Sequence, residues 1–195
     1  MPLSPDPLES EPNQAFLPGS IGEFNFLPFE FDWHTGEAVF RYNFDGAIEF
    51  SERFVFPIPA TGVPEQDKPA IAQTLKLLSL AAGISYYKAA VPTVLNLPAE
   101  GVSKQELQWL RQLYWHGLGE FSYVNQISLR DRLNFKGTIH EQLCSATAAE
   151  LERKSLIAVG GGKDSCVSIE IMRAGGEPIL LASVNRAQPI LEVIE

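Results

Sequence analysis

The sequence predicts an α/β protein whose first part is α+β: an antiparallel β-meander with helices, followed by the start of a domain with a parallel sheet. Three observations predict this fold class. Apolar and polar residues alternate through residues 24–57, and apolar residues recur at helical spacing from Asp67 onward. Near the end of the chain, two short apolar runs flank a glycine-rich loop and an amphipathic segment.

These patterns place the domain boundaries. Residues 1–23 are rich in proline and acidic residues, which predicts a flexible tail. We expect residues 24–150 to form the α+β domain. Residues 151–195 are expected to form a βαβ unit that is about half of a domain, because open sheets of this kind have about five strands. The chain is therefore expected to be a truncated form of a longer protein, without catalysis of its own.

Composition excludes several classes of protein. The 195 residues are 45% hydrophobic and 20% charged, with a net charge of −9, which argues against nucleic acid as a partner. The sequence has no apolar run near the roughly 20 residues that span a bilayer, and its start has neither the basic region nor the apolar region of a secretory signal. The two cysteines, Cys144 and Cys166, form no disulfide framework. We therefore expect a cytoplasmic protein without a membrane partner.

In the first domain, Phe40, Tyr42 and Phe44 share one face of a strand. Thr35-Gly36 and Asp45-Gly46 are expected to form hairpin corners. A helix carries Ile71, Leu75, Leu78 and Ala82, with Pro69 near its start and Gly83 after its end.

An extended segment, "TVLNL", is expected after that helix. Ser103 and Glu106 then predict a capping box for a helix with Leu107, Leu110 and Leu113, closed by Gly117. Residues 118–135 have weak strand character, and a further helix is predicted at about 140–153.

The C-terminal segment changes pattern. Residues 156–159 and 179–184 read as buried parallel strands joined by a helix at about 164–174, a right-handed βαβ unit. In that helix Val167 and Ile171 are expected to face inward, with Cys166 as a third candidate. "QPILEVIE" would open a second helix.

The loop "VGGGKDS" between the first strand and its helix is expected to hold phosphate. A P-loop needs Ser or Thr after its lysine, yet Asp164 follows Lys163. The dinucleotide fingerprint needs a glycine where Ser165 stands. The stretch instead resembles the pyrophosphatase loop (PP-loop) of the N-type ATP pyrophosphatases, S-G-G-x-D-S, with Gly160 in place of the first serine. The alternative is a glycine-rich turn that binds no ligand.

The residue types suit pyrophosphate. Backbone N–H groups of Gly160, Gly161 and Gly162 can converge on it, and the positive end of the following helix adds to them. Ser165 offers a hydroxyl and Lys163 a positive charge. Asp164 would repel phosphate unless a divalent metal bridges the two, and Mg²⁺ is the usual choice.

The meander "FEFDWHTGEAVFRYNFDG", the segment "LLSLAAGISYYKAAVP" and "VGGGKDSCVSIE" together resemble the UDP-N-acetylmuramoyl-L-alanyl-L-glutamate epimerase family. The similarity covers most of residues 24–195. It implies ATP- and Mg²⁺-dependent inversion of the terminal L-glutamate of UDP-MurNAc-L-Ala-L-Glu through a carboxyl-adenylate, in peptidoglycan synthesis. It makes ATP and Mg²⁺ the cofactors, a UDP-MurNAc-dipeptide the small-molecule partner, and Asp164 the metal ligand. Asn185, at the end of the second strand, is expected to contact the nucleotide.

Other possibilities stay open at this point. The chain can belong to another adenylating enzyme with the same loop, of the amide-ligase or tRNA-modifying type, to a nucleotide-binding module without chemistry, or to an inactive fragment. The sequence identifies no racemising base. Cys144 and Cys166 are a candidate two-cysteine pair of racemising bases. The alternative is that both are small buried apolar residues, which is the commoner fate of free cysteines. Lys88 and the histidines His34, His116 and His140 are expected to be packing or solvated residues rather than ligands.

Overall fold

The computed structural model describes residues 18–142, 154–183, 188, 190 and 191. The chain divides into two compact units, Met1–Ala148 and Ala149–Glu195. Among the described residues, no helix combines the length and apolar character needed to cross a bilayer.

The first unit is built on a six-stranded mixed sheet. Strand β3 pairs antiparallel with β1, β2 and β4, whereas β5 pairs parallel with both β1 and β7. The antiparallel pairing predicted for residues 24–57 is confirmed in β1 to β4, but β1 lies beside β3 instead of β2, so these strands are not in meander order. The parallel strands β5 and β7 extend the same sheet. Helical segments separate β4 from β5 and β5 from β7, and such crossovers bring the next strand back parallel. The strands are β1 (Glu23–Phe26), β2 (Glu30–Phe31), β3 (Glu37–Phe44), β4 (Ile48–Val55), β5 (Val94–Asn96) and β7 (Asn134–Lys136).

Both predicted hairpin corners are confirmed. Asp45, Gly46 and Ala47 join β3 to β4. Asp45 and Gly46, with φ values of 51° and 71°, are the two left-handed central residues of a turn that the Ala47 N–H closes by donating to the Phe44 carbonyl at 2.9 Å. Gly36 precedes β3 with φ 75°, and a Cβ at this position would lie 2.0 Å from the Phe56 carbonyl oxygen. Only glycine satisfies both conditions.

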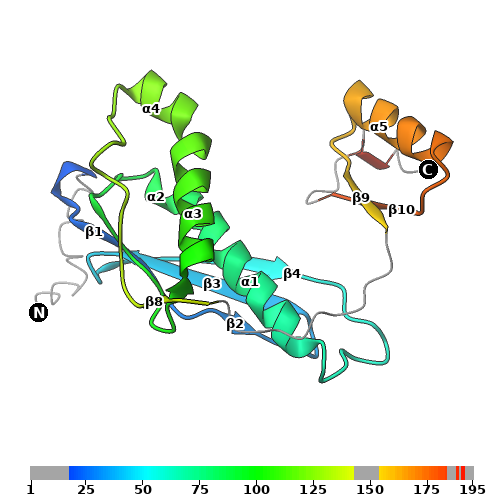
Figure 1. Cartoon of the computed structure of the whole chain (residues 1–195), viewed down its shortest axis with the longest axis horizontal. Coiled ribbons are helices and arrows are strands. Elements are labelled where there is room, and N and C mark those ends of the chain that lie inside the picture. Colours follow the sequence, from blue (N-terminus) through cyan, green and yellow to red (C-terminus); the bar gives the residue numbers. More distant parts are fainter. Residues whose placement is uncertain (1–17, 143–153, 184–187, 189, 192–195) are drawn as a thin grey trace, which may run out of the picture. The chain divides into compact units, whose positions relative to one another are not determined.

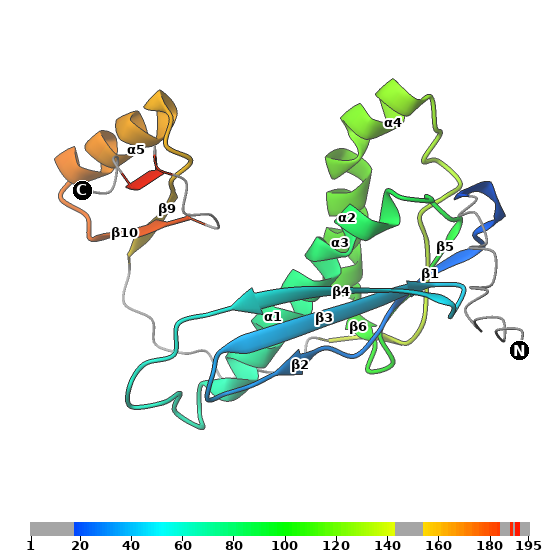
Figure 2. The same ribbon diagram turned by 180° about the vertical axis from the view of Figure 1, so that it is seen from behind.

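The core of this unit lies between the sheet and two helices. Phe40, Tyr42 and Phe44 share the predicted face and are fully buried. Helix α1 (Lys68–Ala82) is confirmed where it was predicted and is followed by the short α2 (Ile84–Tyr87). Figures 1 and 2 show α1 and α3 on one face of the sheet. The Tyr42 hydroxyl donates to the Ser79 carbonyl at 2.8 Å, which ties the sheet to α1.

The predicted capping box is confirmed at the start of α3 (Lys104–Gly117). Just before it, β6 (Val102–Ser103) pairs parallel with β8 (Ile139–His140). The weak strand character expected within residues 118–135 was centred on residues 121–129, and there it is wrong, because Gly119–Asn125 forms helix α4. There the Ser122 N–H donates to the Leu118 carbonyl at 2.8 Å, so helical bonding resumes directly after α3. Only Asn134 and Phe135, at the end of that range, lie in a strand, β7. Of the helix predicted at 140–153, His140 lies in β8 and residues 143–153 lie outside the described residues.

The second unit has the predicted βαβ order. Strands β9 (Ser155–Ala158) and β10 (Ile179–Ala182) pair parallel, and α5 (Lys163–Ala174) connects them. Gln188, Ile190 and Leu191 are helical, within the expected second helix.

The inward face of α5 differs from the prediction. Val167 and Ile171 are 56% and 64% exposed, and Cys166 is exposed as well. Ile169 is 4% exposed and packs with Ile157 and Val159, because the sheet-facing stripe of α5 is centred on Ile169 rather than on its neighbours.

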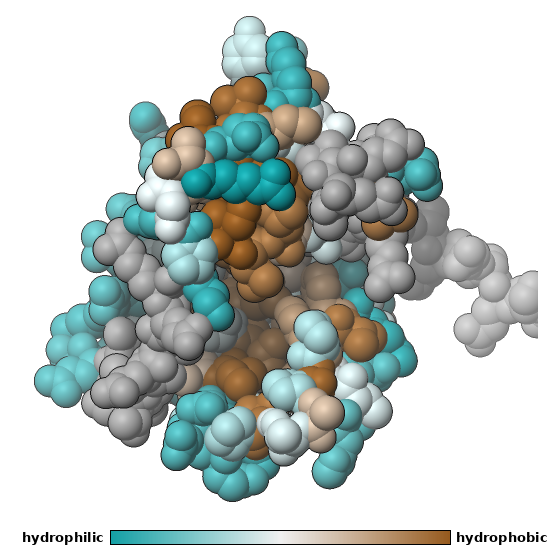
Figure 3. Space-filling view, turned by 90° about the vertical axis from the view of Figure 1, so that its right-hand side faces the viewer, coloured by the Kyte–Doolittle hydropathy of each residue, from teal (hydrophilic) through white to brown (hydrophobic). Residues whose placement is uncertain are grey.

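The two strands are also less buried than predicted. Leu156 is 67% and Leu180 is 58% exposed, so β9 and β10 bury one face among the described residues. Figure 3 shows apolar side chains, in brown, that reach the surface of the chain among hydrophilic ones.

Candidate nucleotide-binding loop

The glycine loop lies at the carboxyl ends of two parallel strands. The Val159 N–H donates to the Ala182 carbonyl at 2.8 Å, so strand pairing continues one residue past β9 and the loop begins at Gly160. Gly162 has φ −99° and ψ 169° and is the N-cap of α5. This edge is where open α/β sheets bind ligands.

Two hydrogen bonds fold the loop against the helix. The Gly160 N–H donates to the Ser165 hydroxyl oxygen at 3.0 Å, and the Ser165 N–H donates to the Gly162 carbonyl at 3.0 Å. The backbone N–H groups of Gly161, Gly162, Lys163 and Asp164 have no acceptor within the described parts of the chain. Adjacent N–H groups at the start of a helix form a nest that suits an anion with several oxygens.

The three glycines have different reasons to be glycine. Gly161 has φ 77°, which side chains rarely adopt. A Cβ at Gly160 or at Gly162 would meet no described atom within 4 Å. Packing of the described chain therefore does not demand glycine at these two positions, whereas a ligand that approached the backbone closely would.

The charged residues of the loop fit a metal-bound phosphate. Lys163 and Asp164 are exposed in the first turn of α5, and the Asp164 carboxylate has no partner in the described residues. Within those residues, no group of three or more His, Cys, Asp or Glu side chains can hold a metal by itself. One carboxylate together with phosphate oxygens and water is the usual environment of Mg²⁺.

Comparison with known proteins gives the family. The MurL N-terminal domain family matches residues 15–195. The chain belongs to this family. The MurL N-terminal domain match includes the mixed sheet, α1 to α4 and the glycine loop.

Three curated relatives are similar over most of the chain, and each is named UDP-N-acetyl-alpha-D-muramoyl-L-alanyl-L-glutamate epimerase. The relative from Xanthomonas oryzae pv. oryzae is 36% identical over 176 residues, which is 90% of this chain and 39% of the relative. Those from Salinispora tropica and Micromonospora sp. are 36% and 34% identical and cover 83% and 88% of the chain. The chain thus spans 36–39% of the length of these relatives. No solved structure matches.

The structure brings together only part of the predicted site. Gly160, Gly161, Gly162, Lys163, Asp164 and Ser165 form one continuous loop and helix start. Asn185 and Cys144 lie outside the described residues, so neither the nucleotide contact nor the cysteine pair is tested.

The remaining candidates lie away from this loop in the sequence. Lys88, His34, His116 and His140 are all exposed. The ring Nε2 of His140 lies 2.8 Å from the Glu100 carbonyl oxygen, which accounts for that side chain structurally.

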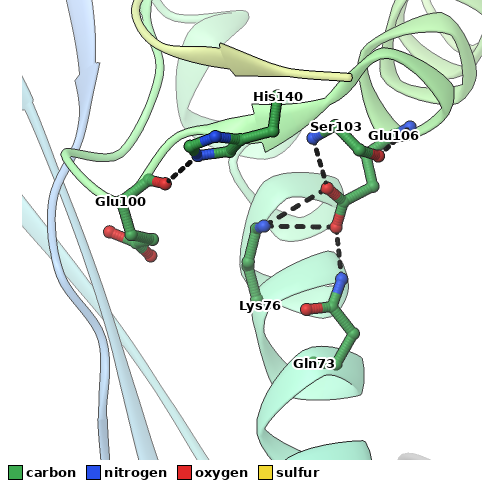
Figure 4. A network of polar contacts seen from close by, with 6 residues as sticks. All are labelled: Gln73, Lys76, Glu100, Ser103, Glu106 and His140. Carbon is green, nitrogen blue, oxygen red and sulfur yellow. Dashed lines mark hydrogen bonds and ion pairs between the residues drawn. The ribbon is translucent and has the colours of Figure 1, made fainter. Parts of the chain in front are cut away.

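A buried polar network in the first unit was only half predicted. Glu106 is 5% exposed and closes the capping box, and it also forms an ion pair with Lys76 at 3.2 Å (Figure 4). Gln73 donates to the same carboxylate. Burial alone would raise the pKa of Glu106, but the Ser103 N–H and the Lys76 charge outweigh it and lower this pKa below its ordinary value. The network joins α1 to α3 through a buried carboxylate, so we assign it to stability.

Proposed function

We propose that this chain acts in the ATP- and Mg²⁺-dependent epimerisation of the terminal L-glutamate of UDP-MurNAc-L-Ala-L-Glu to D-glutamate, in peptidoglycan synthesis. The observation that carries this proposal is the similarity to three epimerases of that name over 83–90% of the chain. The open glycine loop supports it, because within the described residues four of its N–H groups and the Asp164 carboxylate have no partner.

The reaction needs activation of the substrate. A Cα proton beside a carboxylate is very weakly acidic, since the carbanion would lie next to a negative charge. A carboxylate oxygen would attack the α-phosphorus of ATP and displace pyrophosphate, and the resulting carboxyl-adenylate would no longer carry this charge. A modest general base could then remove the proton, and its return from the opposite face would invert the centre. Hydrolysis of the adenylate would restore the carboxylate and release AMP.

The chain's own residues would hold the nucleotide. The N–H groups of Gly161 and Gly162 would donate to pyrophosphate oxygens, and Lys163 would offset their charge. Asp164 would hold Mg²⁺ against the same oxygens. The Ser165 hydroxyl keeps its proton for a phosphate oxygen while it accepts from Gly160. Asn185 remains our candidate for a further nucleotide contact.

A chimera tests the reaction. This chain would replace the matching 176 residues of the Xanthomonas oryzae relative, and the product would be incubated with substrate, ATP and Mg²⁺. We expect D-glutamate after hydrolysis and chiral analysis, with one AMP formed per turnover. The unmodified relative serves as the positive control.

The same chimera with Asp164→Ala is expected to form neither D-glutamate nor AMP. AMP formation with retention of L-glutamate would favour an amide-forming ligase instead. A folded chimera that binds MgATP yet forms neither product would contradict the proposal.

A further inference from the structure

Helix α3 presents an unusual surface for so acidic a protein. The chain has a net charge of −9, yet the exposed side chains of α3 are basic, amide or aromatic. The one carboxylate of this helix, Glu106, is buried and paired with Lys76. Such a surface complements an anionic ligand that carries a flat ring.

Three hollows follow one another along this face. The first, of about 400 Å³, and the second, of about 280 Å³, share Arg111 and Gln112. The second and the third, of about 570 Å³, share Trp115. The three hollows, which we call the track, thus lie side by side from the first turn of α3 to the segment after α4, and offer separate places for the base and the phosphates of one ligand.

The third hollow offers a place for a pyrimidine base. Trp115, which is 48% exposed, forms one wall and can stack on an aromatic ring. Arg130 and Asp131 line the same hollow, and within the described residues neither side chain has an ion-pair partner. Uracil presents an N–H donor between two carbonyl oxygens. A carboxylate can accept from that N–H while a guanidinium donates to the neighbouring oxygen.

The second and first hollows offer a place for phosphates. The guanidinium of Arg111 lies one helical turn before Trp115 and has no carboxylate partner in the described residues. His116 lines the second hollow. Lys104 lines the first, although it also pairs with Glu141 at 2.7 Å. With the base in the third hollow, a diphosphate in the second and first hollows lies farther from the Asp131 carboxylate than the base does. This placement reduces the repulsion between the two negative groups.

We propose that this face of α3 binds the uridine diphosphate part of the substrate, with the uracil between Trp115, Arg130 and Asp131 and the diphosphate at Arg111. The choice of uridine diphosphate as the ligand rests on the proposed function. The cationic and aromatic side chains along α3 are observed in the structure and do not depend on that proposal.

Calorimetric titration of the 195-residue chain with UDP, uridine and ADP tests the assignment. UDP is expected to bind more tightly than either of the others. Arg111→Gln is expected to weaken UDP at least tenfold and to leave uridine unchanged, because uridine has no phosphate. The matched control is Arg53→Gln, an exposed arginine of β4 that pairs with Glu37 and lines none of the hollows.

The base hollow has its own pair of variants. Trp115→Leu is expected to weaken both UDP and uridine. Trp109→Leu, at an exposed tryptophan of the same helix that lines none of the three hollows, is expected to weaken neither. Asp131→Asn is expected to reduce the preference for UDP over ADP.

The outcomes separate this inference from the proposed function. No UDP binding at millimolar concentration, equal binding of ADP, or UDP affinity that is unchanged in Arg111→Gln and Trp115→Leu would each overturn it. None of these titrations requires ATP or turnover. Epimerisation by the chimera with no UDP binding at α3 would therefore refute this inference alone, and UDP binding at α3 without epimerisation would leave it standing.

Discussion

The backbone N–H of Gly160 donates to the hydroxyl oxygen of Ser165 at 3.0 Å, so the last residue of the glycine loop holds the first in place. The bond spans the segment whose other N–H groups point to no described acceptor. It therefore fixes the loop in the open form that an anion would meet.

Ser165→Ala tests this bond. We expect MgATP to bind about tenfold more weakly, because the variant loses both the loop-closing acceptor and a donor to phosphate. Unfolding free energy is expected to fall by about 1 kcal/mol or less, since the bond is exposed. Titration calorimetry and urea unfolding measure the two effects. Ser168→Ala, three residues further along α5, is the control and should leave MgATP binding unchanged.

Asp164→Ala is expected to weaken MgATP at least tenfold with little effect on folding, because an exposed carboxylate at the start of α5 contributes little to the core. Titrations with and without Mg²⁺ distinguish loss of the metal from loss of the nucleotide. The matched control is Glu170→Ala, an exposed carboxylate of the same helix. Unchanged Mg²⁺ dependence in Asp164→Ala would rule out the metal-holding role.

Gly161→Val and Gly160→Ala separate strain from ligand approach. Gly161 has φ 77°, so valine there is expected to cost at least about 1–2 kcal/mol of stability and to abolish MgATP binding. Gly160→Ala adds a Cβ in open space, so stability should be preserved while MgATP binding weakens. Melting curves and nucleotide titration report the two quantities. Full MgATP affinity in Gly160→Ala would contradict close backbone approach at that residue.

Local patterns predicted the features that depend on neighbours in sequence. Asp45-Gly46 predicted a tight hairpin because few residues tolerate two consecutive left-handed conformations, and Ser103 with Glu106 predicted a helix start because the two groups satisfy each other's N–H. The order strand, glycine loop, helix and strand predicted the parallel pairing of β9 with β10 because a crossover helix leaves little alternative.

Features that depend on distant partners were missed. The aromatic residues of α4 suggested a strand, yet the helical bonding that resumes from Leu118 decided otherwise. The inward face of α5 was misjudged because several apolar residues compete and only the position of β9 and β10 selects Ile169. Lys76 and Gln73 contact Glu106 although they are 30 and 33 residues away from it in the sequence. Local residue spacing cannot predict contacts between residues so far apart in the chain.

The Glu106 network gives a prediction about acid stability of the first unit. The pKa of this carboxyl is lowered in the folded chain from an ordinary value of 4.5, chiefly by the Ser103 N–H and Lys76 against the opposing effect of burial. A lowered folded pKa stabilises the fold fully above the unfolded pKa, and the contribution is lost as the pH falls through the folded pKa. Stability of this unit should therefore decline below about pH 4.5.

Glu106→Gln keeps the shape of the side chain and removes its charge. We expect it to lower the unfolding free energy at neutral pH by about 2 kcal/mol, because Lys76, only 15% exposed, loses its counter-charge. The acid-dependent decline should flatten in the variant. Tryptophan fluorescence in urea measures this, since all three tryptophans, Trp33, Trp109 and Trp115, lie in the first unit. Glu49→Gln, at an exposed carboxylate of β4, should match the unmodified chain. If Glu106→Gln were as stable as Glu49→Gln at neutral pH and declined as steeply in acid, the ion pair would not stabilise the contact between α1 and α3.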